Sequence, residues 1–184
     1  MPIAFVLVFD EKSTSQLTHL SKSFIKENIT SLEPKVRPHI TLNVYSYIDT
    51  EIAKKRLIQI CNQFEPFKIQ FSSIGYFPSE ESVIFLNPKT SFKLLTIQQR
   101  VFELFNDFKA ESTPEDWNPH CTLVTYVSSE KLPKAIDIIK KGIIMTMDQP
   151  FYAIANAIDV IDFEREPLKI NSINKFNLKG DVNK

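Results

Sequence analysis

Pro38-His39-Ile40-Thr41-Leu42-Asn43-Val44-Tyr45 is the stretch that decides the fold, because the chain contains it twice in related form. The second copy is Pro119-His120-Cys121-Thr122-Leu123-Val124-Thr125-Tyr126, so both copies follow the pattern Pro-His-x-Thr-Leu-x-x-Tyr. The two histidines lie 81 residues apart, close to half of the 184-residue chain. Each copy leads into an amphipathic helical segment. We predict two similar α+β halves related by a pseudo-dyad, which would place the two motifs opposite each other.

Apolar and polar residues alternate in the first copy, and this period of two predicts a β-strand. The residues predicted to face the core are Ile40, Leu42 and Val44, and those predicted to face the other side are His39, Thr41, Asn43 and Tyr45. Residues i and i+2 of a strand share a face and lie about 6.6–7 Å apart, so each histidine has a threonine hydroxyl beside it. In the second copy Cys121 takes the place of Ile40, so we expect its thiol to point into the core and not to act as a nucleophile.

Hydrophobic periodicity predicts the elements around the two motifs. Further strands are expected at residues 3–8, 68–76, 83–87, 151–160 and 168–176, and helices at residues 13–28, 53–64, 92–108 and 133–141. No linker, low-complexity tract or charge run divides the sequence. We therefore predict that residues 1–184 form a single domain built of two lobes.

Composition limits the classes of ligand. Lys plus Arg and Asp plus Glu number 22 each, so the formal net charge is zero. Proteins that hold long nucleic acid through its phosphates usually carry a basic excess. We therefore expect a small nucleotide, a cyclic nucleotide or an RNA end as the substrate, and no long duplex. The three glycines argue against a glycine-rich phosphate loop, which needs several glycines at fixed spacing.

The cysteines and the N-terminal segment favour a cytoplasmic protein. Cys61 and Cys121 have neither metal-ligand spacing nor a disulfide framework, which indicates a reducing compartment. The apolar run within residues 1–13 is too short to span a membrane, and it lacks a basic n-region and a small-residue cleavage site. We expect a cytoplasmic location and no membrane partner.

Two imidazoles that face each other suit in-line displacement at phosphorus. A neutral imidazole takes a proton from the attacking hydroxyl or water, and a protonated one gives a proton to the leaving oxygen. Histidine serves in both forms because its unperturbed pKa lies near neutrality. The hydroxyls of Thr41 and Thr122 could donate hydrogen bonds to the non-bridging phosphate oxygens as charge builds. We predict no metal and no cofactor, since no cysteine or carboxylate cluster in the sequence offers a site.

The strength of this signal lies in its repetition. A single His-x-Thr pair on a strand is most often an ordinary surface or half-buried pair. Two copies with matching prolines and leucines are hard to explain by coincidence. We therefore predict that His39, Thr41, His120 and Thr122 are catalytic residues. The sequence leaves open which histidine is the base, because the pseudo-dyad makes their surroundings alike.

The motifs resemble those of the 2H phosphoesterases, a family with two His-hydrophobic-[Thr/Ser]-hydrophobic motifs about half a chain apart. His39-Ile40-Thr41-Leu42 and His120-Cys121-Thr122-Leu123 fit this pattern. The resemblance covers nearly the whole chain, and the segments Gly75-Tyr76-Phe77-Pro78 and Val83-Ile84-Phe85-Leu86 are similar to the family's central hairpin. It implies a bilobal, pseudo-symmetric α+β fold in which two antiparallel sheets flank a central groove, with helices outside.

The resemblance also implies a function, that of a phosphoric diester hydrolase acting on 2′-linked or 2′,3′-cyclic phosphodiesters of nucleotides or RNA ends. Phe77 is predicted to bind the substrate by contacting the base, because family members often present an aromatic residue there, and the alternative is a phenylalanine that packs the loop. Arg37 could reach a phosphate, and the alternative is a solvated charge. The alternatives are a non-catalytic nucleotide-binding or RNA-binding module with the same fold, and 2′-5′ RNA ligase activity. We expect a monomer, with Trp117 as a core or loop anchor and His19 on the surface.

Overall fold

The computed structural model describes residues 2–32, 34–146, 150–165 and 168–180 and contains the elements that the sequence predicts. The strands are β1 (Ile3–Phe9), β2 (His39–Tyr45), β3 (Phe67–Phe77), β4 (Glu81–Pro88), β5 (Cys121–Ser128), β6 (Tyr152–Glu164) and β7 (Lys169–Asn177). The α-helices are α1 (Glu11–Lys26), α2 (Thr50–Gln63), α3 (Phe92–Leu104) and α4 (Leu132–Thr146), and a short 3-10 helix, η1 (Ser129–Lys131), precedes α4. Element bounds differ from the predicted ones by a few residues, as expected for helix and strand ends.

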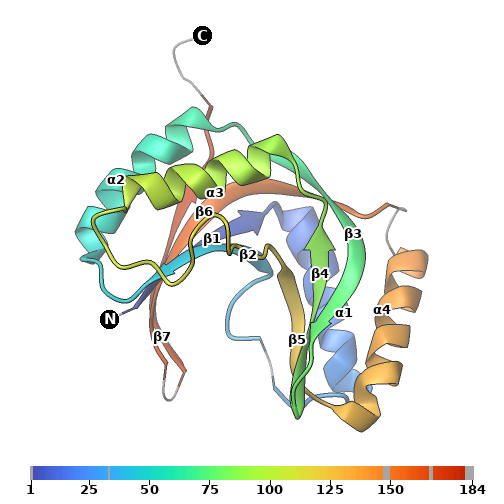
Figure 1. The fold of residues 1–184 in the computed structure, drawn as a ribbon. Helices are drawn as coiled ribbons and strands as arrows, with labels where there is room; N and C mark the ends of the chain where they lie inside the picture. Colours follow the sequence, from blue (N-terminus) through green and yellow to red (C-terminus); the bar gives the residue numbers. More distant parts are fainter. Residues whose placement is uncertain (1, 33, 147–149, 166–167, 181–184) are drawn as a thin grey trace.

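The strands pair antiparallel in the order β2-β1-β6-β3-β4-β5, and β7 pairs with β6 beside this path. Strand β3 belongs to both parts of the sheet, because its residues 67–70 pair with β6 and its later residues pair with β4. One part therefore contains β2, β1, β6 and β7, and the other contains β3, β4 and β5 (Figure 1). This arrangement confirms the predicted fold class, with the addition that the two sheets are continuous through β3.

Two pairs of helices cover the two parts of the sheet. Helices α1 and α4 pack against each other and against β5, while α2 packs against α3, β6 and β7 (Figure 1). The apolar stripe of α1 is buried, with Leu17, Leu20 and Phe24 between 0% and 3% exposed. Burying one such side chain contributes roughly 1.5–3 kcal/mol, so packing on the sheet is what holds the helix in place.

Side-chain caps explain where three helices begin. The carboxylate of Asp10 accepts a hydrogen bond from the backbone N–H of Ser13 at 2.9 Å, at the start of α1. Asp49 caps α2 and Ser91 caps α3 in the same way. Each cap satisfies a backbone donor that has no partner inside the helix and contributes about 1 kcal/mol.

Both motif strands contain a bulge immediately after the threonine. In the first copy Val6 pairs with Thr41 and Phe5 with Asn43, so Leu42 is the extra residue. In the second copy Phe85 pairs with Thr122 and Ile84 with Val124, so Leu123 is the extra residue. A bulge lets two consecutive side chains lie on one face and bends the strand. The repeat in the sequence is therefore also a repeat in backbone structure.

The first bulge corrects three predicted orientations. Asn43 was expected on the side of the histidines, but it is 1% exposed and pairs with Phe5 of the main core. Tyr45 was expected on the side of the histidines, but it is fully buried in the main core beside Phe5 and Phe105. Val44 was expected in that core, but it packs on the opposite face against a small cluster that contains Val6. The prediction assumed an unbroken period of two, and one extra residue reverses every later side chain. The second copy differs here, since Tyr126 has a φ of 60° and is 55% exposed.

Candidate active site

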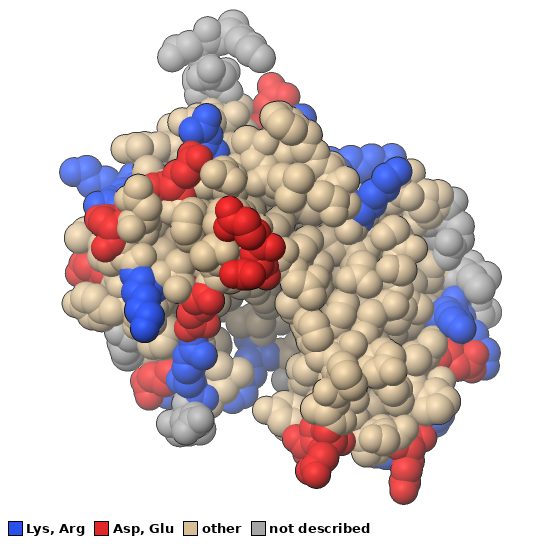
Figure 2. Space-filling model, viewed as in Figure 1, with Lys and Arg blue, Asp and Glu red and all other residues tan. Residues whose placement is uncertain are grey.

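The two motif histidines come together because the ends of the strand path meet. Strands β2 and β5 are the first and last strands of the path, yet they contact each other. His39 is the first residue of β2, and His120 immediately precedes β5. The charge on His120 acts on the pKa of His39, which requires the two imidazoles to lie near each other. The molecular surface is hollowed between the two parts of the molecule (Figure 2).

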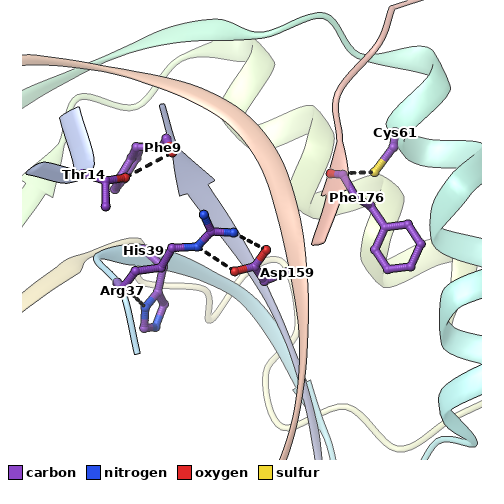
Figure 3. Close-up of polar contacts among 7 residues, drawn as sticks. All are labelled: Phe9, Thr14, Arg37, His39, Cys61, Asp159 and Phe176. Atoms are coloured by element: carbon purple, nitrogen blue, oxygen red, sulfur yellow. Dashed lines mark hydrogen bonds and ion pairs between the residues drawn. The ribbon is translucent and has the colours of Figure 1, made fainter. Parts of the chain in front are cut away.

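Each imidazole makes the same backbone contact. His39 Nδ1 lies 2.8 Å from the carbonyl oxygen of Arg37 (Figure 3), and His120 Nδ1 lies 2.8 Å from the carbonyl oxygen of Asn118. A carbonyl oxygen only accepts hydrogen bonds, so Nδ1 must be the protonated nitrogen in both rings. The Nε2 atom of each ring is thereby left to accept or give a proton. Both rings are also fixed in orientation, as catalytic imidazoles generally are.

The environment of His39 lowers its pKa from the ordinary value of 6.5. Burial is the largest cause, because it disfavours the charged imidazolium, and the charge on His120 acts in the same direction. The hydrogen bond to the Arg37 carbonyl and the carboxylate of Asp159 oppose the shift without cancelling it. His39 is therefore mainly neutral at neutral pH, which is the form that a general base needs.

The two threonines are half-buried and follow their histidines by two residues, ahead of each bulge. Since alternation is unbroken over that distance, each hydroxyl shares a face with its imidazole. The carbonyl oxygen of Thr41 accepts a hydrogen bond of 2.9 Å from the indole nitrogen of Trp117, which also packs against the core. Trp117 is thus the anchor that the sequence predicts.

Two phenylalanines flank His120. The ring of Phe77 meets the imidazole edge-on, with centroids 5.1 Å apart and planes at 86°, and the ring of Phe85 also lies 5.1 Å away. Phe77 is 38% exposed and Phe85 is 4% exposed, so Phe77 is the one with a free surface for a ligand. Sequence reasoning missed Phe85, although alternation in β4 places it opposite the buried Ile84 and Leu86.

The space for the Phe85 ring comes from Gly75, its partner across the β3–β4 pair. A Cβ atom at position 75 would lie within 2.7 Å of Phe85 Cζ, which is closer than real carbon contacts. Gly75 therefore leaves room for the Phe85 ring, which lies 5.1 Å from the imidazole of His120.

Arg37 is held by a buried carboxylate. Its Nε and Nη2 atoms donate to the two oxygens of Asp159 at 2.8 and 2.5 Å, and Asp159 is 1% exposed. The guanidinium extends to Asp159 on β6, while the imidazole of His39 extends away from it (Figure 3). Arg37 thus positions the carbonyl that orients His39, and its contact with a phosphate stays a prediction. Asp159 has no motif around it that could have identified it in the sequence.

Cys121 is fully buried, which confirms its predicted inward orientation. Burial raises the pKa of its thiol to about 12, so the thiolate is not formed near neutral pH. Within the described residues, no three His, Cys, Asp or Glu side chains are grouped so that they could hold a metal ion. No helix in that part of the chain is long and apolar enough to cross a membrane.

The continuous two-part sheet with paired histidines has the form of a two-histidine phosphoesterase. Residues 9–164 match the sequence model of the family described as the 2'-5' RNA ligase superfamily, and the chain belongs to that superfamily. The resemblance seen in the motifs is thereby confirmed, and membership supports phosphoesterase-type activity. No curated protein matches the sequence at a significant level.

Solved structures share the fold over nearly the whole chain. TT0787 of Thermus thermophilus has a TM-score of 0.67 at 13% identity, with 98% of this chain and 100% of that chain covered. E. coli LigT complexed with 3'-AMP has a TM-score of 0.63 at 13% identity, with 97% and 99% covered. Kluyveromyces marxianus Usb1 with uridine monophosphate has a TM-score of 0.51 at 9% identity, with 96% and 98% covered. At such identities the likeness shows the fold alone.

Proposed function

We propose that this protein is a phosphodiesterase that acts on 2′-linked or 2′,3′-cyclic phosphodiesters of nucleotides or RNA ends, by acid–base catalysis between two histidines. The observation that carries the proposal is the matched contact of His39 and His120. Both rings give their Nδ1–H to a backbone carbonyl and so keep Nε2 for proton transfer. A module that only binds a ligand has no need of two imidazoles fixed in this way.

The surroundings of the histidines support a division of roles. His39 has a lowered pKa and acts as the base, taking a proton from the attacking oxygen at Nε2. His120 acts as the acid, donating a proton from Nε2 to the leaving oxygen. The threonine hydroxyls at positions 41 and 122 donate hydrogen bonds to the non-bridging oxygens, where charge develops. No step in this scheme needs a metal ion or a cofactor.

Two reactions fit this arrangement. With a 2′,3′-cyclic phosphate, water loses a proton to His39 and its oxygen bonds to phosphorus, while one ring P–O bond breaks and that oxygen takes a proton from His120. With a 2′-5′ linkage, the neighbouring ribose 3′-OH attacks phosphorus in place of water. The P–O5′ bond then breaks, and O5′ takes the proton from His120. In both cases the proton count balances, and His39 and His120 exchange states in each turnover.

A nucleotide fits the aromatic side of the site. The exposed face of Phe77 is available for stacking, which contributes about 1–3 kcal/mol per base in proteins that bind single strands. Solved structures of LigT with 3'-AMP and of Usb1 with uridine monophosphate show that relatives in fold bind mononucleotides. We infer that the base rests on Phe77 and the reacting phosphate lies between the two histidines.

The decisive experiment is a substrate panel followed by mass spectrometry. It contains 2′,3′-cyclic mononucleotides, 2′,5′-oligoadenylates, RNA ends with a cyclic phosphate and cyclic dinucleotides. We expect hydrolysis of at least one 2′-linked or 2′,3′-cyclic member, with and without a chelator. Ligand binding without turnover of any member would favour a non-catalytic module, and joining of RNA ends would favour a ligase.

Variants test whether turnover depends on the histidines and threonines of the candidate active site. His39→Ala and His120→Ala are each expected to abolish turnover while circular dichroism and the melting temperature stay close to those of the wild type. Thr41→Val removes the hydroxyl and should lower kcat about 10²-fold, whereas Thr41→Ser keeps it and should retain most activity. Full activity in both histidine variants would overturn the proposed mechanism.

A further inference from the structure

A cavity of about 580 Å³ lies beside the candidate active site and is lined by neither catalytic histidine. One wall is the polar face of α1, where Glu11, Ser15, Thr18 and Lys22 follow one another at helical spacing. The other wall comes from the opposite part of the molecule and includes Arg37 and Lys175 of β7. The volume is in the range of small-molecule sites and far exceeds what a single ion needs.

The charge in this cavity is mainly positive. Lys22, Arg37 and Lys175 line it together with the imidazole of His19, against one lining carboxylate, that of Glu11. Among the described residues, neither Lys22 nor Lys175 forms an ion pair. Because the chain as a whole has zero net charge, this concentration of cations is local. Hydroxyl groups and ammonium groups on facing walls are suitable donors to phosphate oxygens.

Arg37 lines the cavity and also contacts His39 through its backbone carbonyl. Asp159 occupies its Nε and Nη2 atoms, which fixes the plane of the guanidinium and leaves Nη1 to donate to a ligand in the cavity. The carboxylate of Asp159 offsets part of the charge on Arg37, so the two lysines carry most of the attraction. The carbonyl of Arg37 also accepts the Nδ1–H of His39. The residue that would hold a ligand in the cavity therefore also orients the imidazole of His39.

We propose that this cavity is a second anion subsite, which binds a phosphate of the substrate other than the one that reacts. It rests on the proposed function for the identity of the reacting group, and it narrows the substrate class to nucleotides with at least two phosphates. A short oligonucleotide with a phosphorylated end meets this description. The reacting phosphodiester lies between His39 and His120, and the second phosphate lies between Lys22 and Lys175.

The test compares ligands that differ by one phosphate. The probes are a 2′,5′-linked diadenylate with two hydroxyl ends and its forms phosphorylated at the 5′ or at the 3′ end. Binding is measured by calorimetry with the His120→Ala variant, which does not consume the probe. We expect one phosphorylated form to bind about tenfold more tightly than the unphosphorylated form at low salt, and the advantage to shrink as salt rises.

Lysine variants test whether the gain in affinity from the terminal phosphate arises in the cavity. Lys22→Ala and Lys175→Ala are each expected to reduce the affinity ratio of phosphorylated to unphosphorylated probe at least about threefold. The matched control is Lys12→Ala, because Lys12 is an exposed lysine of the same helix that does not line the cavity, and it should leave the ratio unchanged. Equal affinity of all three probes, or an unchanged ratio in both lysine variants, would overturn the proposal.

Failure of the second subsite can be distinguished from failure of the proposed function. If the wild type hydrolyses no member of the panel, the catalytic proposal fails, but the affinity ratio still reports on the cavity. If hydrolysis occurs and a terminal phosphate gives no advantage in binding, the second subsite fails and the catalytic proposal stands.

Discussion

The indole nitrogen of Trp117 donates a hydrogen bond to the carbonyl oxygen of Thr41 at 2.9 Å, and this bond links the loop before the second histidine motif to the first motif. Trp117 precedes His120 by three residues, and Thr41 follows His39 by two. The same loop also touches β2 where the side-chain amide of Asn43 donates to the carbonyl of Ser112 at 3.0 Å. The relative position of the two histidines thus depends on this loop as well as on the packing of β2 against β5.

Trp117→Phe keeps an aromatic ring but removes the N–H. We expect a loss of about 1–2 kcal/mol in the free energy of unfolding, because the Thr41 carbonyl loses its partner. We also expect kcat to fall roughly tenfold with little change in KM, since small misplacement of a catalytic group is costly. Urea denaturation and steady-state kinetics measure the two effects. A lower stability with an unchanged kcat would show that Trp117 only anchors the loop.

Arg37→Met is expected to be strongly destabilising. It leaves the carboxylate of Asp159, 1% exposed, without its partner, and breaking a buried pair in this way costs about 3–5 kcal/mol. The double variant Arg37→Met/Asp159→Leu should recover much of that loss. The matched control is Arg56→Met, which breaks a bidentate pair with Asp107 whose side chains are 32% and 48% exposed. We expect the control to lose about 1 kcal/mol. Urea denaturation measures these losses. Similar losses in Arg37→Met and Arg56→Met would contradict the conclusion that Arg37 compensates the buried charge of Asp159.

The lowered pKa of His39 predicts a specific dependence on pH. In the unfolded chain this imidazole takes up a proton near its ordinary pKa of 6.5, whereas in the folded protein it does so only at lower pH. The unfolded state therefore binds more protons as pH falls below about 6.5, and His39 makes the free energy of unfolding decrease in that window. Above pH 6.5 His39 is mainly neutral in both the folded and the unfolded protein, so it adds no pH dependence to the free energy of unfolding.

The same shift sets the acid side of the activity profile. Because His39 must be neutral to act as the base, the fall of kcat/KM on the acid side should lie below pH 6.5. Chemical denaturation at pH 5 to 8 should show a smaller decrease in stability for His39→Gln than for the wild type. An acid limb above pH 6.5, or identical stability curves for the two proteins, would contradict the role given to His39.

Much of the fold could be predicted because it follows from local periodicity. The helices carry apolar stripes at a period of 3.6, β1 is a continuous apolar run, and the repeated motif predicts that the two histidines face each other. Cys121 was predicted to be buried for the same reason, and it is. Periodicity failed at Tyr45, since the bulge at Leu42 depends on the pairing of β2 with β1 and leaves no mark in the local sequence.

The site residues that the sequence did not predict depend on tertiary contacts. Phe85 of β4 meets His120, which precedes the neighbouring strand β5, and Asp159 reaches Arg37 over a separation of 122 residues. The single sequence gives no sign of which buried residue will meet which partner, because such contacts are set by the arrangement of the elements. Likewise, the cationic cavity lies between α1 and β7. Neither Lys22 nor Lys175, which line it, stands in a sequence motif that predicts a site.

Gly75 tests whether Phe85 positions His120. An alanine Cβ at position 75 would meet the Phe85 ring and also come within 2.9 Å of Asn87 Nδ2, so the ring that packs on the imidazole must shift. Overpacking of this kind costs about 1–3 kcal/mol, and we expect Gly75→Ala to lower kcat roughly tenfold as well. Gly75→Ala/Phe85→Leu removes the clash but also removes the ring that packs on His120. It should therefore regain stability without regaining kcat.

Gly142→Ala is the matched control for this comparison. Its Cβ would lie 2.7 Å from Leu20 Cδ1, the far end of a flexible side chain on α1, away from both histidines. Gly142→Ala should alter the free energy of unfolding and leave kcat unchanged. If Gly75→Ala behaves in the same way, Phe85 is a packing residue only. If the double variant recovers stability but stays slow, the Phe85 ring holds His120 in the orientation that proton transfer requires.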